Sequence, residues 1–350
     1  MSLSKRLINS NDTGGGGGAS ATLAFFRVNL GSSGKITSVD ISDPNNIIPL
    51  DIDTDTDFQG VDNKIVFSSD KDYIFAPGGT NKIMSERVSI PSNLFTAQEF
   101  VVVDDLQYCD LDTSNNTLYA TATNTGIYSY DVSDPTNISF LDNYSNSSQM
   151  QNTRGIRVDS VNQIAYVVSN PSFNSTILSF DISNPSSISF LDSINLGSVE
   201  VPYEIELDLV NNVAYVSEST NEKLIAVNIS NPSNMSILGS YQNGTYFFRP
   251  ANMQIDTTNN ILYAGNDSRD AISALDISDP TNISLISQIV DTTNLREPII
   301  RLDPSLNIIW SACGGDRLTA VDVSDPSNMS IINSYQDGNY IDSANDFLIK

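Results

Sequence analysis

The chain has no histidine among its 350 residues, and this absence removes several chemistries at once. Without an imidazole there is no Ser-His-Asp or Cys-His nucleophile system, no histidine zinc ligand and no histidine acid–base catalyst. The glycine run at residues 14–18 lacks the Lys-Ser/Thr pair of a phosphate-binding loop, so we interpret it as a flexible spacer. No pair of carboxylates stands out among the 42 acidic residues as a glycosidase pair. We therefore expect no enzymatic activity.

Basic residues and cysteines are also scarce. The 17 Lys and Arg face 42 Asp and Glu, which gives a formal net charge of −25 and argues against nucleic acid or an anionic membrane as partner. The two cysteines, Cys109 and Cys313, fall in distant repeats, so we expect two unpaired thiols and assembly in a reducing compartment. No segment approaches the roughly 20 apolar residues of a membrane helix, and residues 1–20 lack the apolar core of a secretory signal.

What the chain does contain is one short signature repeated along its whole length. Asp131-Val-Ser-Asp-Pro135 is a clear copy, and Arg87-Val-Ser-Ile-Pro91 is a degenerate one. The copies end at Pro44, Pro91, Pro135, Pro185, Pro232, Pro280 and Pro326. Spacings of 44 to 50 residues with strand-like content predict a radial or stacked array of small sheets.

Each repeat contains four strand-like segments, which we name a, b, c and d. In one repeat they are residues 155–159, 163–168, 176–182 and 188–193. Strand b is almost entirely apolar, as expected of a strand buried on both faces, whereas strands a and c alternate apolar and polar residues. Asp and Asn cluster at the a–b and c–d connections, where both residues favour tight turns. We interpret these Asp residues as turn formers rather than as ligands or catalysts.

Seven repeats of four antiparallel strands predict an all-β fold, a seven-bladed β-propeller over residues 21–350. The first blade lacks strand a, because the chain begins with strand b at residues 22–28 and strand c at 35–39. Residues 344–350 follow the last strand d and supply the missing strand, so we expect the C-terminal strand to complete the first blade and close the ring. Residues 1–20 are predicted to be a flexible, glycine-rich N-terminal arm.

The repeats resemble those of the LVIVD family. The signature is followed by a strand that ends in Leu238-Gly-Ser-Tyr241, as in that family. The resemblance implies a β-propeller, often on secreted or surface proteins of bacteria and usually without an assigned enzymatic activity. A second resemblance covers residues 1–18, which are similar to the N-terminal segments of some tailed-phage virion proteins.

Two sets of residues are candidate sites. Arginine and aromatic residues recur at the d-to-a connections near the channel mouth, a composition typical of a binding hot spot for protein or sugar, although each Arg would also serve to pair with a nearby Asp. The candidate binding residues are Arg154, Tyr203, Tyr246, Phe248, Arg249, Arg296 and Tyr340. The alternating carboxylates Asp51, Asp53, Asp55 and Asp57 form a candidate Ca²⁺ loop or, alternatively, a solvated loop. The loop lacks the Gly and Glu of an EF-hand, and no other cofactor is implied.

These features lead to a functional hypothesis. We expect a non-enzymatic virion structural, decoration or host-binding protein of a tailed phage, anchored to other virion proteins by Lys5 and Arg6 of the arm. Its free face would bind a host surface glycan or protein. The alternative is an exported bacterial cell-surface adhesion module of LVIVD type, located outside the cell. A third reading is a carbohydrate-active propeller that hydrolyses a host polysaccharide.

Overall fold

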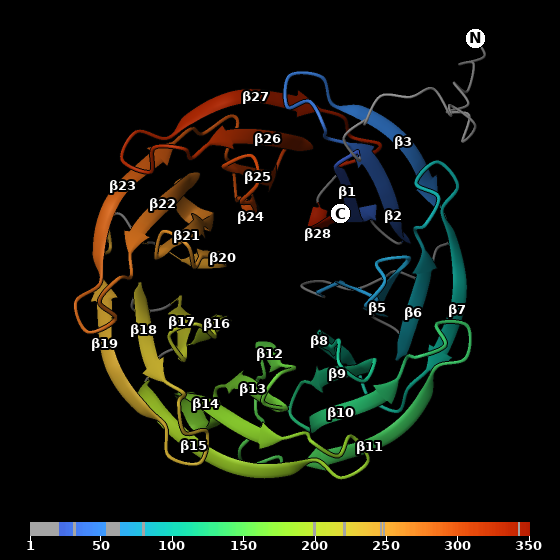
Figure 1. Cartoon of the computed structure of the whole chain (residues 1–350), viewed down its shortest axis with the longest axis vertical. Coiled ribbons are helices and arrows are strands. Elements are labelled where there is room, and N and C mark those ends of the chain that lie inside the picture. Colours follow the sequence, from blue (N-terminus) through green and yellow to red (C-terminus); the bar gives the residue numbers. More distant parts are fainter. Residues whose placement is uncertain are drawn as a thin grey trace.

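The predicted β-propeller is confirmed. The computed structural model describes residues 21–350 apart from 31–32, 54–63, 79–80, 199–200, 220–221, 246, 248 and 342–343. Seven four-stranded antiparallel sheets stand side by side around a common axis, with strand a innermost and strand d outermost (Figure 1). Among the described residues, no helix has the length and apolar character needed to cross a membrane.

The first blade is assembled from the two ends of the chain, as the sequence predicts. Its strands in spatial order are β28 (Ala344–Ile349), β1 (Leu23–Leu30), β2 (Ser33–Asp40) and β3 (Ile48–Asp53). The backbones of Leu23 and Lys350 exchange two hydrogen bonds of 2.9 and 2.8 Å at the end of the β1–β28 pair. The C-terminal strand therefore closes the ring and occupies the inner edge of the first blade.

The other six blades follow in chain order, each running from strand a to strand d. The second and third blades are β4 (Val66–Phe67), β5 (Tyr73–Gly78), β6 (Lys82–Arg87), β7 (Phe95–Val101), β8 (Leu106–Asp112), β9 (Thr117–Ala122), β10 (Gly126–Asp131) and β11 (Ser139–Ser145). The fourth and fifth are β12 (Gly155–Asp159), β13 (Ile164–Ser169), β14 (Asn174–Asp181), β15 (Ser189–Ser198), β16 (Pro202–Asp208), β17 (Val213–Glu218), β18 (Lys223–Asn228) and β19 (Ser236–Gln242). The sixth and seventh are β20 (Pro250–Asp256), β21 (Ile261–Asn266), β22 (Ala271–Asp276), β23 (Ser284–Val290), β24 (Ile299–Asp303), β25 (Ile308–Cys313), β26 (Arg317–Asp322) and β27 (Ser330–Gln336).

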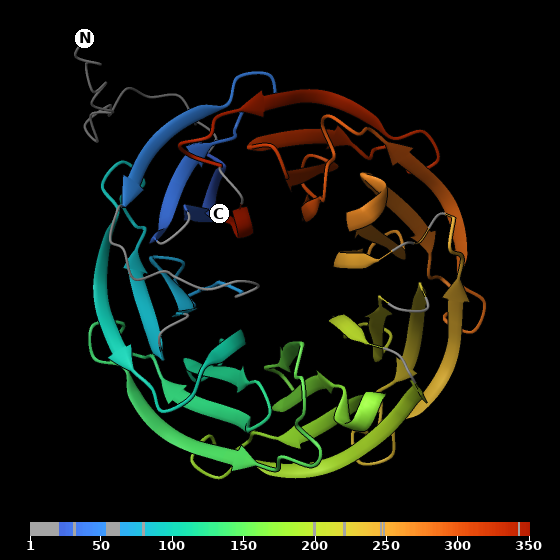
Figure 2. The same ribbon diagram turned by 180° about the vertical axis from the view of Figure 1, so that it is seen from behind.

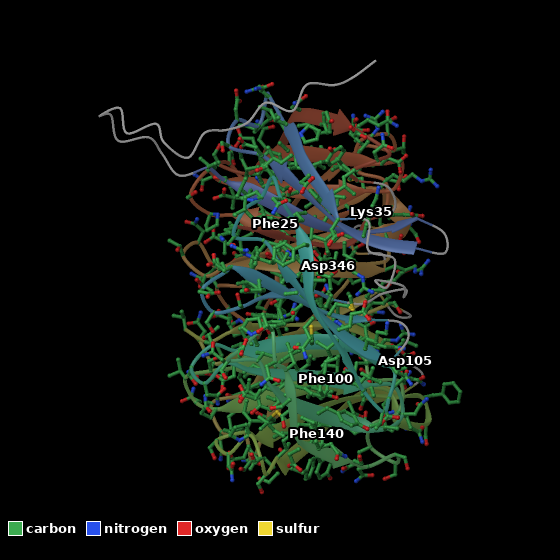
Figure 3. The ribbon with its side chains drawn as sticks, turned by 90° about the vertical axis from the view of Figure 1, so that its right-hand side faces the viewer. Phe25, Lys35, Phe100, Asp105, Phe140 and Asp346 are labelled. Carbon is green, nitrogen blue, oxygen red and sulfur yellow. The ribbon has the colours of Figure 1, made fainter. Side chains whose placement is uncertain are left out.

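The disc has two different faces. The b–c and d–a connections lie on one face, which we call the loop face, and the a–b and c–d turns lie on the other, the turn face. Two short 3-10 helices, η1 (Pro171–Phe173) and η2 (Asp267–Arg269), belong to b–c connections and are seen in Figure 2. The edge-on view of Figure 3 shows Lys35, at the start of a strand c, and Asp105, in a d–a connection, toward the same side of the disc.

The Asp and Asn residues of the a–b turns have the structural role predicted for them. Asp208 accepts backbone N–H bonds of 3.0 Å from both Val210 and Asn211, and Asn212 adopts a left-handed φ of 55°. The same left-handed position recurs at Asn116, Gln163, Asn260 and Asn307. Asn tolerates this conformation better than most residues because its short side chain bonds locally, so the turn chemistry is repeated blade after blade.

The signature prolines have a further role that the sequence did not reveal. At six of the seven junctions, the proline carbonyl accepts a side-chain hydrogen bond from the preceding blade. The hydroxyl donors are Ser38 to Pro91, Ser85 to Pro135, Ser129 to Pro185, Ser179 to Pro232 and Ser287 to Pro326, at 2.5–2.6 Å. Asn333 donates to Pro44 at 3.0 Å and so joins the last blade to the first. At the remaining junction, a Cβ on Gly239 would lie 2.6 Å from the Pro280 oxygen, so only glycine fits there.

A second set of contacts joins strand d of one blade to the backbone of the next. The acceptors are side-chain oxygens, and each donor is an N–H three residues after a signature proline. They pair Asp51 with Leu94, Gln98 with Ile138, Asp142 with Ile188 and Asp192 with Met235, at 2.7–2.9 Å. These bonds satisfy N–H groups that the sheets leave unpaired, and they fix the angle between neighbouring blades.

The junction between the last blade and the first is filled by aromatic side chains. Trp310 of β25 is fully buried in one cluster with Phe26 of β1 and Phe347 of β28. The Phe26 and Phe347 rings stack with centroids 5.1 Å apart. Because the chain has a single tryptophan, its fluorescence reports on this closing junction.

Replacing Ser179 by alanine should weaken the contact between the fourth and fifth blades. The Pro232 carbonyl would lose its donor, which we expect to lower the free energy of unfolding by about 1 kcal/mol. Urea denaturation followed by circular dichroism measures this change. The exposed Ser139 is the control, and an equal loss in Ser139→Ala would contradict the role of the buried hydroxyl.

Removing the Phe347 side chain should loosen the ring at its closing junction. We expect Phe347→Ala to cost about 3–5 kcal/mol, because a large buried ring leaves a cavity, and to shift Trp310 emission to longer wavelength. Phe173→Ala is the control, since that ring is 75% exposed. Unchanged Trp310 emission in Phe347→Ala would contradict a role of the Phe347 ring in this junction.

Candidate functional site

Charged side chains gather at the axis, where the seven innermost strands meet. We call the six residues concerned the axial cluster: Lys64, Arg157, Glu204, Glu206, Arg301 and Asp346. Five of them lie in strand a, and Lys64 lies two residues before β4; together they come from five different blades. Strand a places them there because it alternates polar with apolar residues, as in Gly155-Ile-Arg-Val-Asp159, and its apolar residues pack between the blades.

Glu204 is the hub of the axial cluster. Its side chain is only 3% exposed and accepts bonds from Lys64 Nζ at 2.8 Å and Arg157 Nη2 at 3.1 Å through Oε1. Its other oxygen accepts a bond of 3.2 Å from Asn252 Nδ2. Lys64 belongs to the second blade and Glu204 to the fifth, so this ion pair connects non-neighbouring blades across the axis. A buried carboxylate needs such partners, because an unpaired charge would be costly to bury.

Arg157 also binds the second carboxylate of the fifth blade. Its Nη2 and Nε atoms lie 2.5 and 3.2 Å from the two oxygens of Glu206, a bidentate arrangement. Burial alone would lower the pKa of Arg157, but the two glutamates raise it well above its usual value. Asp110, on the other side of Arg157, accepts a 2.8 Å bond from the Val158 N–H, and burial raises the pKa of its carboxyl.

A second ion pair continues the cluster around the axis. Arg301 Nη2 donates to Asp346 Oδ1, and the guanidinium lies over the Phe347 ring with its carbon 5.6 Å from the ring centroid. The other oxygen of Asp346 accepts a 3.0 Å bond from the Ile65 N–H of the second blade. Arg301 and Asp346 therefore join the last blade, the composite first blade and the second blade.

Two buried groups lie close behind the cluster. Burial lowers the pKa of Arg27 to about 10, and its guanidinium donates a 2.9 Å bond to the Pro77 carbonyl. Cys109 is fully buried beside it, and burial strongly raises the pKa of its thiol. Cys313 is a buried, unpaired thiol in another blade, so the two cysteines form no disulfide. Protonated, buried thiols of this kind are poor nucleophiles.

Solvent reaches part of the cluster. The side chains of Lys64, Arg157, Glu206 and Arg301 are 13–20% exposed, whereas Glu204 and Asp346 are almost completely covered. Three cations and one carboxylate thus present some surface at the axis. Such a set can bind a small anionic or polyhydroxylated molecule through charge-assisted hydrogen bonds.

The predicted arginine and aromatic residues are placed around the loop face in successive blades. The backbones of the d–a segments bond the b–c side of each blade, for example Gly314 N to Arg296 O at 2.7 Å. Arg249 and Arg296 are exposed, and Arg154, Tyr203 and Tyr340 are half-buried. Arg249 pairs with Asp267 at 3.4 Å, which is the structural role weighed against binding. Tyr246 and Phe248 lie outside the described residues, and binding by this set stays a prediction.

Of the four carboxylates predicted to bind Ca²⁺, two lie among the described residues and two do not. Asp51 is the acceptor for the Leu94 N–H, and Asp53 lies 3.5 Å from the Thr96 hydroxyl, so both point toward the second blade. Asp55 and Asp57 lie outside the described residues, as do Lys5 and Arg6 of the arm. Within the described ranges, no three Asp, Glu, Cys or His side chains are grouped to hold a metal ion. The Ca²⁺ loop therefore stays a prediction.

The axial cluster was missed at the level of sequence, although a signal was present. Asp110, Arg157, Glu206, Gln254 and Arg301 occupy the same position of strand a in consecutive blades, each opposite an aromatic residue of strand b. Polar residues that recur in register within an inner strand indicate a polar axis. Pairing across the axis, as between Lys64 and Glu204, leaves no such trace in the sequence.

Solved structures of similar fold include several proteins named as lactonases. The chain matches a putative 6-phosphogluconolactonase from Bacteroides uniformis with a TM-score of 0.76 and 10% identity, over 94% of this chain and 99% of that one. A putative 6-phosphogluconolactonase from Bacteroides fragilis gives a TM-score of 0.76 and 10% identity, over 94% and 98%. The periplasmic gluconolactonase PpgL of Pseudomonas aeruginosa gives 0.74 and 12%, also over 94% and 98%. At such identities the likeness shows the shared fold alone.

These matches correct the functional hypothesis. The expectation of a phage virion protein is wrong: the structures that superpose on 94% of the chain include three proteins named as lactonases, and none of the structures compared bears the name of a virion protein. The hypothesis rested on the N-terminal arm, the missing secretory signal and an edge-free surface rich in Asn, Ser and Asp. The Asp, Asn and Ser residues form the turns and blade junctions that hold a propeller together, and so say nothing about a virion. The expected absence of enzymatic activity stays a prediction, because the same fold occurs in proteins named as lactonases and a shared fold does not fix an activity.

The family resemblance is confirmed within the ring. The LVIVD repeat matches residues 207–243, in the fifth blade, and residues 312–337, in the seventh. Curated proteins give no match, and the resemblance of residues 1–18 to phage virion arms has no counterpart in these comparisons. The chain is therefore a seven-bladed β-propeller that carries LVIVD repeats.

Proposed function

We propose that this chain is a hydrolase that opens a sugar-derived lactone at the axial cluster. The observation that carries the proposal is the group formed by Arg157, Lys64 and two glutamates at the axis, with Arg157, Lys64 and Glu206 still partly exposed to solvent. The fold shared with proteins named as lactonases supports this choice of reaction class.

Lactone opening needs few groups. Water attacks the ester carbonyl while a base takes its proton, and the new C–O bond gives a tetrahedral oxyanion. The carbonyl then forms again as the ring C–O bond breaks, and the proton passes from the base to the departing ring oxygen. A carboxylate that accepts the proton and cations that stabilise the oxyanion lower the barrier. Glu206 is the proposed base, because it is the one carboxylate of the axial cluster whose side chain solvent partly reaches. Lys64 and Arg157 are the proposed oxyanion partners, and Arg301 is the proposed partner of the product carboxylate.

A second candidate is binding without hydrolysis. Glu204 already accepts bonds from Lys64, Arg157 and Asn252, and Glu206 is held in a bidentate pair. Ion-paired carboxylates are weaker bases, which favours a site that holds a sugar acid and leaves it unchanged. The two candidates share the ligand and differ in turnover.

The purified protein should accelerate the hydrolysis of glucono-δ-lactone, followed by acid release with a pH indicator. We expect Glu206→Gln to lower kcat by at least about tenfold with little change in KM, because it removes the proton acceptor and keeps the side-chain shape. Glu99→Gln is the matched control. Glu99 lies on the outer strand β7, far from the axis, and pairs with Lys82 of β6.

The hydrolysis assay and a binding measurement together decide between the two candidate functions. Equal kcat for the wild-type protein and Glu206→Gln would remove Glu206 from the reaction. No acceleration of any aldonolactone, together with calorimetric binding of gluconate that Arg157→Ala abolishes, would leave the binding function. A protein that neither hydrolyses an aldonolactone nor binds gluconate would contradict both candidate functions.

A further inference from the structure

A buried amide side chain joins the two ion-paired groups of the axial cluster. Asn252 lies in β20 of the sixth blade and is 1% exposed. Its Nδ2 donates a 3.2 Å bond to Glu204 of the fifth blade, and its Oδ1 accepts a 2.9 Å bond from the Ile300 N–H of the seventh. Arg301 Nη1 lies 3.4 Å from the same amide oxygen. Asn252 is therefore an uncharged link between the group around Glu204 and the pair of Arg301 with Asp346.

The orientation of the Asn252 amide follows from its neighbours. The Ile300 N–H and the Arg301 guanidinium can only donate, so the atom that faces them must be the amide oxygen. The amide nitrogen is left to face Glu204, whose carboxylate can only accept. The position thus needs a donor on one side and an acceptor on the other. A carboxylate or an apolar side chain there would leave a buried neighbour without its partner.

Other blades place a carboxylate where the sixth blade has this amide oxygen. Asp346 and Asp110 each accept an N–H bond from the next blade, at 3.0 and 2.8 Å. Asp346 is paired with Arg301, and the positive charge of Arg157 favours the ionised form of Asp110. Asn252 instead has a carboxylate beside it. A neutral side chain at this place avoids the repulsion between two buried carboxylates.

The bond from Asn252 fixes how the Glu204 carboxylate is turned. Glu204 Oε1 accepts from Lys64 Nζ at 2.8 Å and from Arg157 Nη2 at 3.1 Å, and Oε2 accepts from Asn252. The last side-chain torsion of Glu has broad preferences, so its own rotamer does not fix the direction of the two oxygens. With Oε2 held, Oε1 stays directed at the two cations. These cations are the proposed oxyanion partners.

We propose, on the basis of the function proposed for the axial cluster, that Asn252 is a positioning residue of that site. Its amide fixes the orientation of the Glu204 carboxylate and keeps a second negative charge away from it. Through Glu204 it holds Lys64 and Arg157 in the places where their partly exposed side chains meet a ligand. Asn252 itself is buried and acts only through its neighbours.

Replacing Asn252 by aspartate tests the contact without any ligand. The change keeps the shape but turns the donor toward Glu204 into an acceptor. Burial and Glu204 should raise the pKa of the new carboxyl, and Arg301, Lys64 and Arg157 offset only part of this rise. A carboxyl with a raised folded-state pKa loses stability as it gives up its proton. The urea midpoint of Asn252→Asp should therefore fall further below that of the wild type between about pH 5 and about pH 8.

Binding of gluconate, measured by calorimetry, tests the effect on the site. We expect the affinity of Asn252→Asp to be at least about tenfold below that of the wild type at about pH 8, and within about twofold of it at about pH 5. Only the ionised carboxyl repels Glu204 and turns it away from Lys64. A change of packing alone would weaken binding equally at both values of pH.

Asn259→Asp is the matched control in the same blade. Asn259 Nδ2 also donates to a carboxylate, that of Asp256 at 2.7 Å, but in an exposed turn. Water screens the two charges there, so gluconate affinity and its pH dependence should stay as in the wild type. The variant Asn252→Asp/Glu204→Gln exchanges donor and acceptor and restores the total charge. Its stability should lose the pH dependence of Asn252→Asp.

Each outcome decides the role of Asn252. Equal pH dependence of stability and affinity in the wild type and Asn252→Asp overturns it, as does the same loss in Asn259→Asp. If Asn252→Asp fails to fold, folding of Asn252→Asp/Glu204→Gln supports the contact, and failure of both overturns it. A wild type that neither binds gluconate nor opens a lactone contradicts the proposed function, whereas the ligand-free urea midpoints still decide whether Asn252 positions Glu204.

Discussion

The hydrogen bond from a side chain of one blade to the backbone of the next is the interaction on which this molecule depends. A four-stranded sheet exposes two faces, and the blade is stable only when both are covered by neighbours. Apolar side chains supply the contact area between blades but do not fix an angle. The serine-to-proline-carbonyl bonds, exemplified by Ser179 and Pro232, and the carboxylate-to-N–H bonds, exemplified by Asp51 and Leu94, provide that direction.

The axial cluster follows from the same geometry. Seven inner strands converge on one axis, and polar side chains placed there are brought close together with little water to solvate them. Their charges must then pair, and the pairs run around the ring and across it, with Glu204 held by Lys64, Arg157 and Asn252. Such a network specifies one arrangement of blades, and its partly exposed members provide the chemistry assigned to the proposed lactone site.

The two faces of the disc differ in the residues that they expose. The loop face contains the b–c and d–a connections and the exposed Arg249 and Arg296. The turn face contains the repeated Asp-rich turns, whose carboxylates are used structurally and still leave a strongly negative surface with exposed valines.

The sequence by itself determined the number of blades, the strand order within them and the closure by residues 344–350. These features depend on local patterns: apolar strand b, Asp and Asn at the turns, and proline after each strand c. Only the tertiary structure decided what the signature carbonyls bond, why Gly239 is needed and which charges meet at the axis. Lys64 and Glu204 are 140 residues apart and have no feature in common that links them. Ring closure alone brings them together, because contacts across an axis depend on the curvature accumulated over all seven blades.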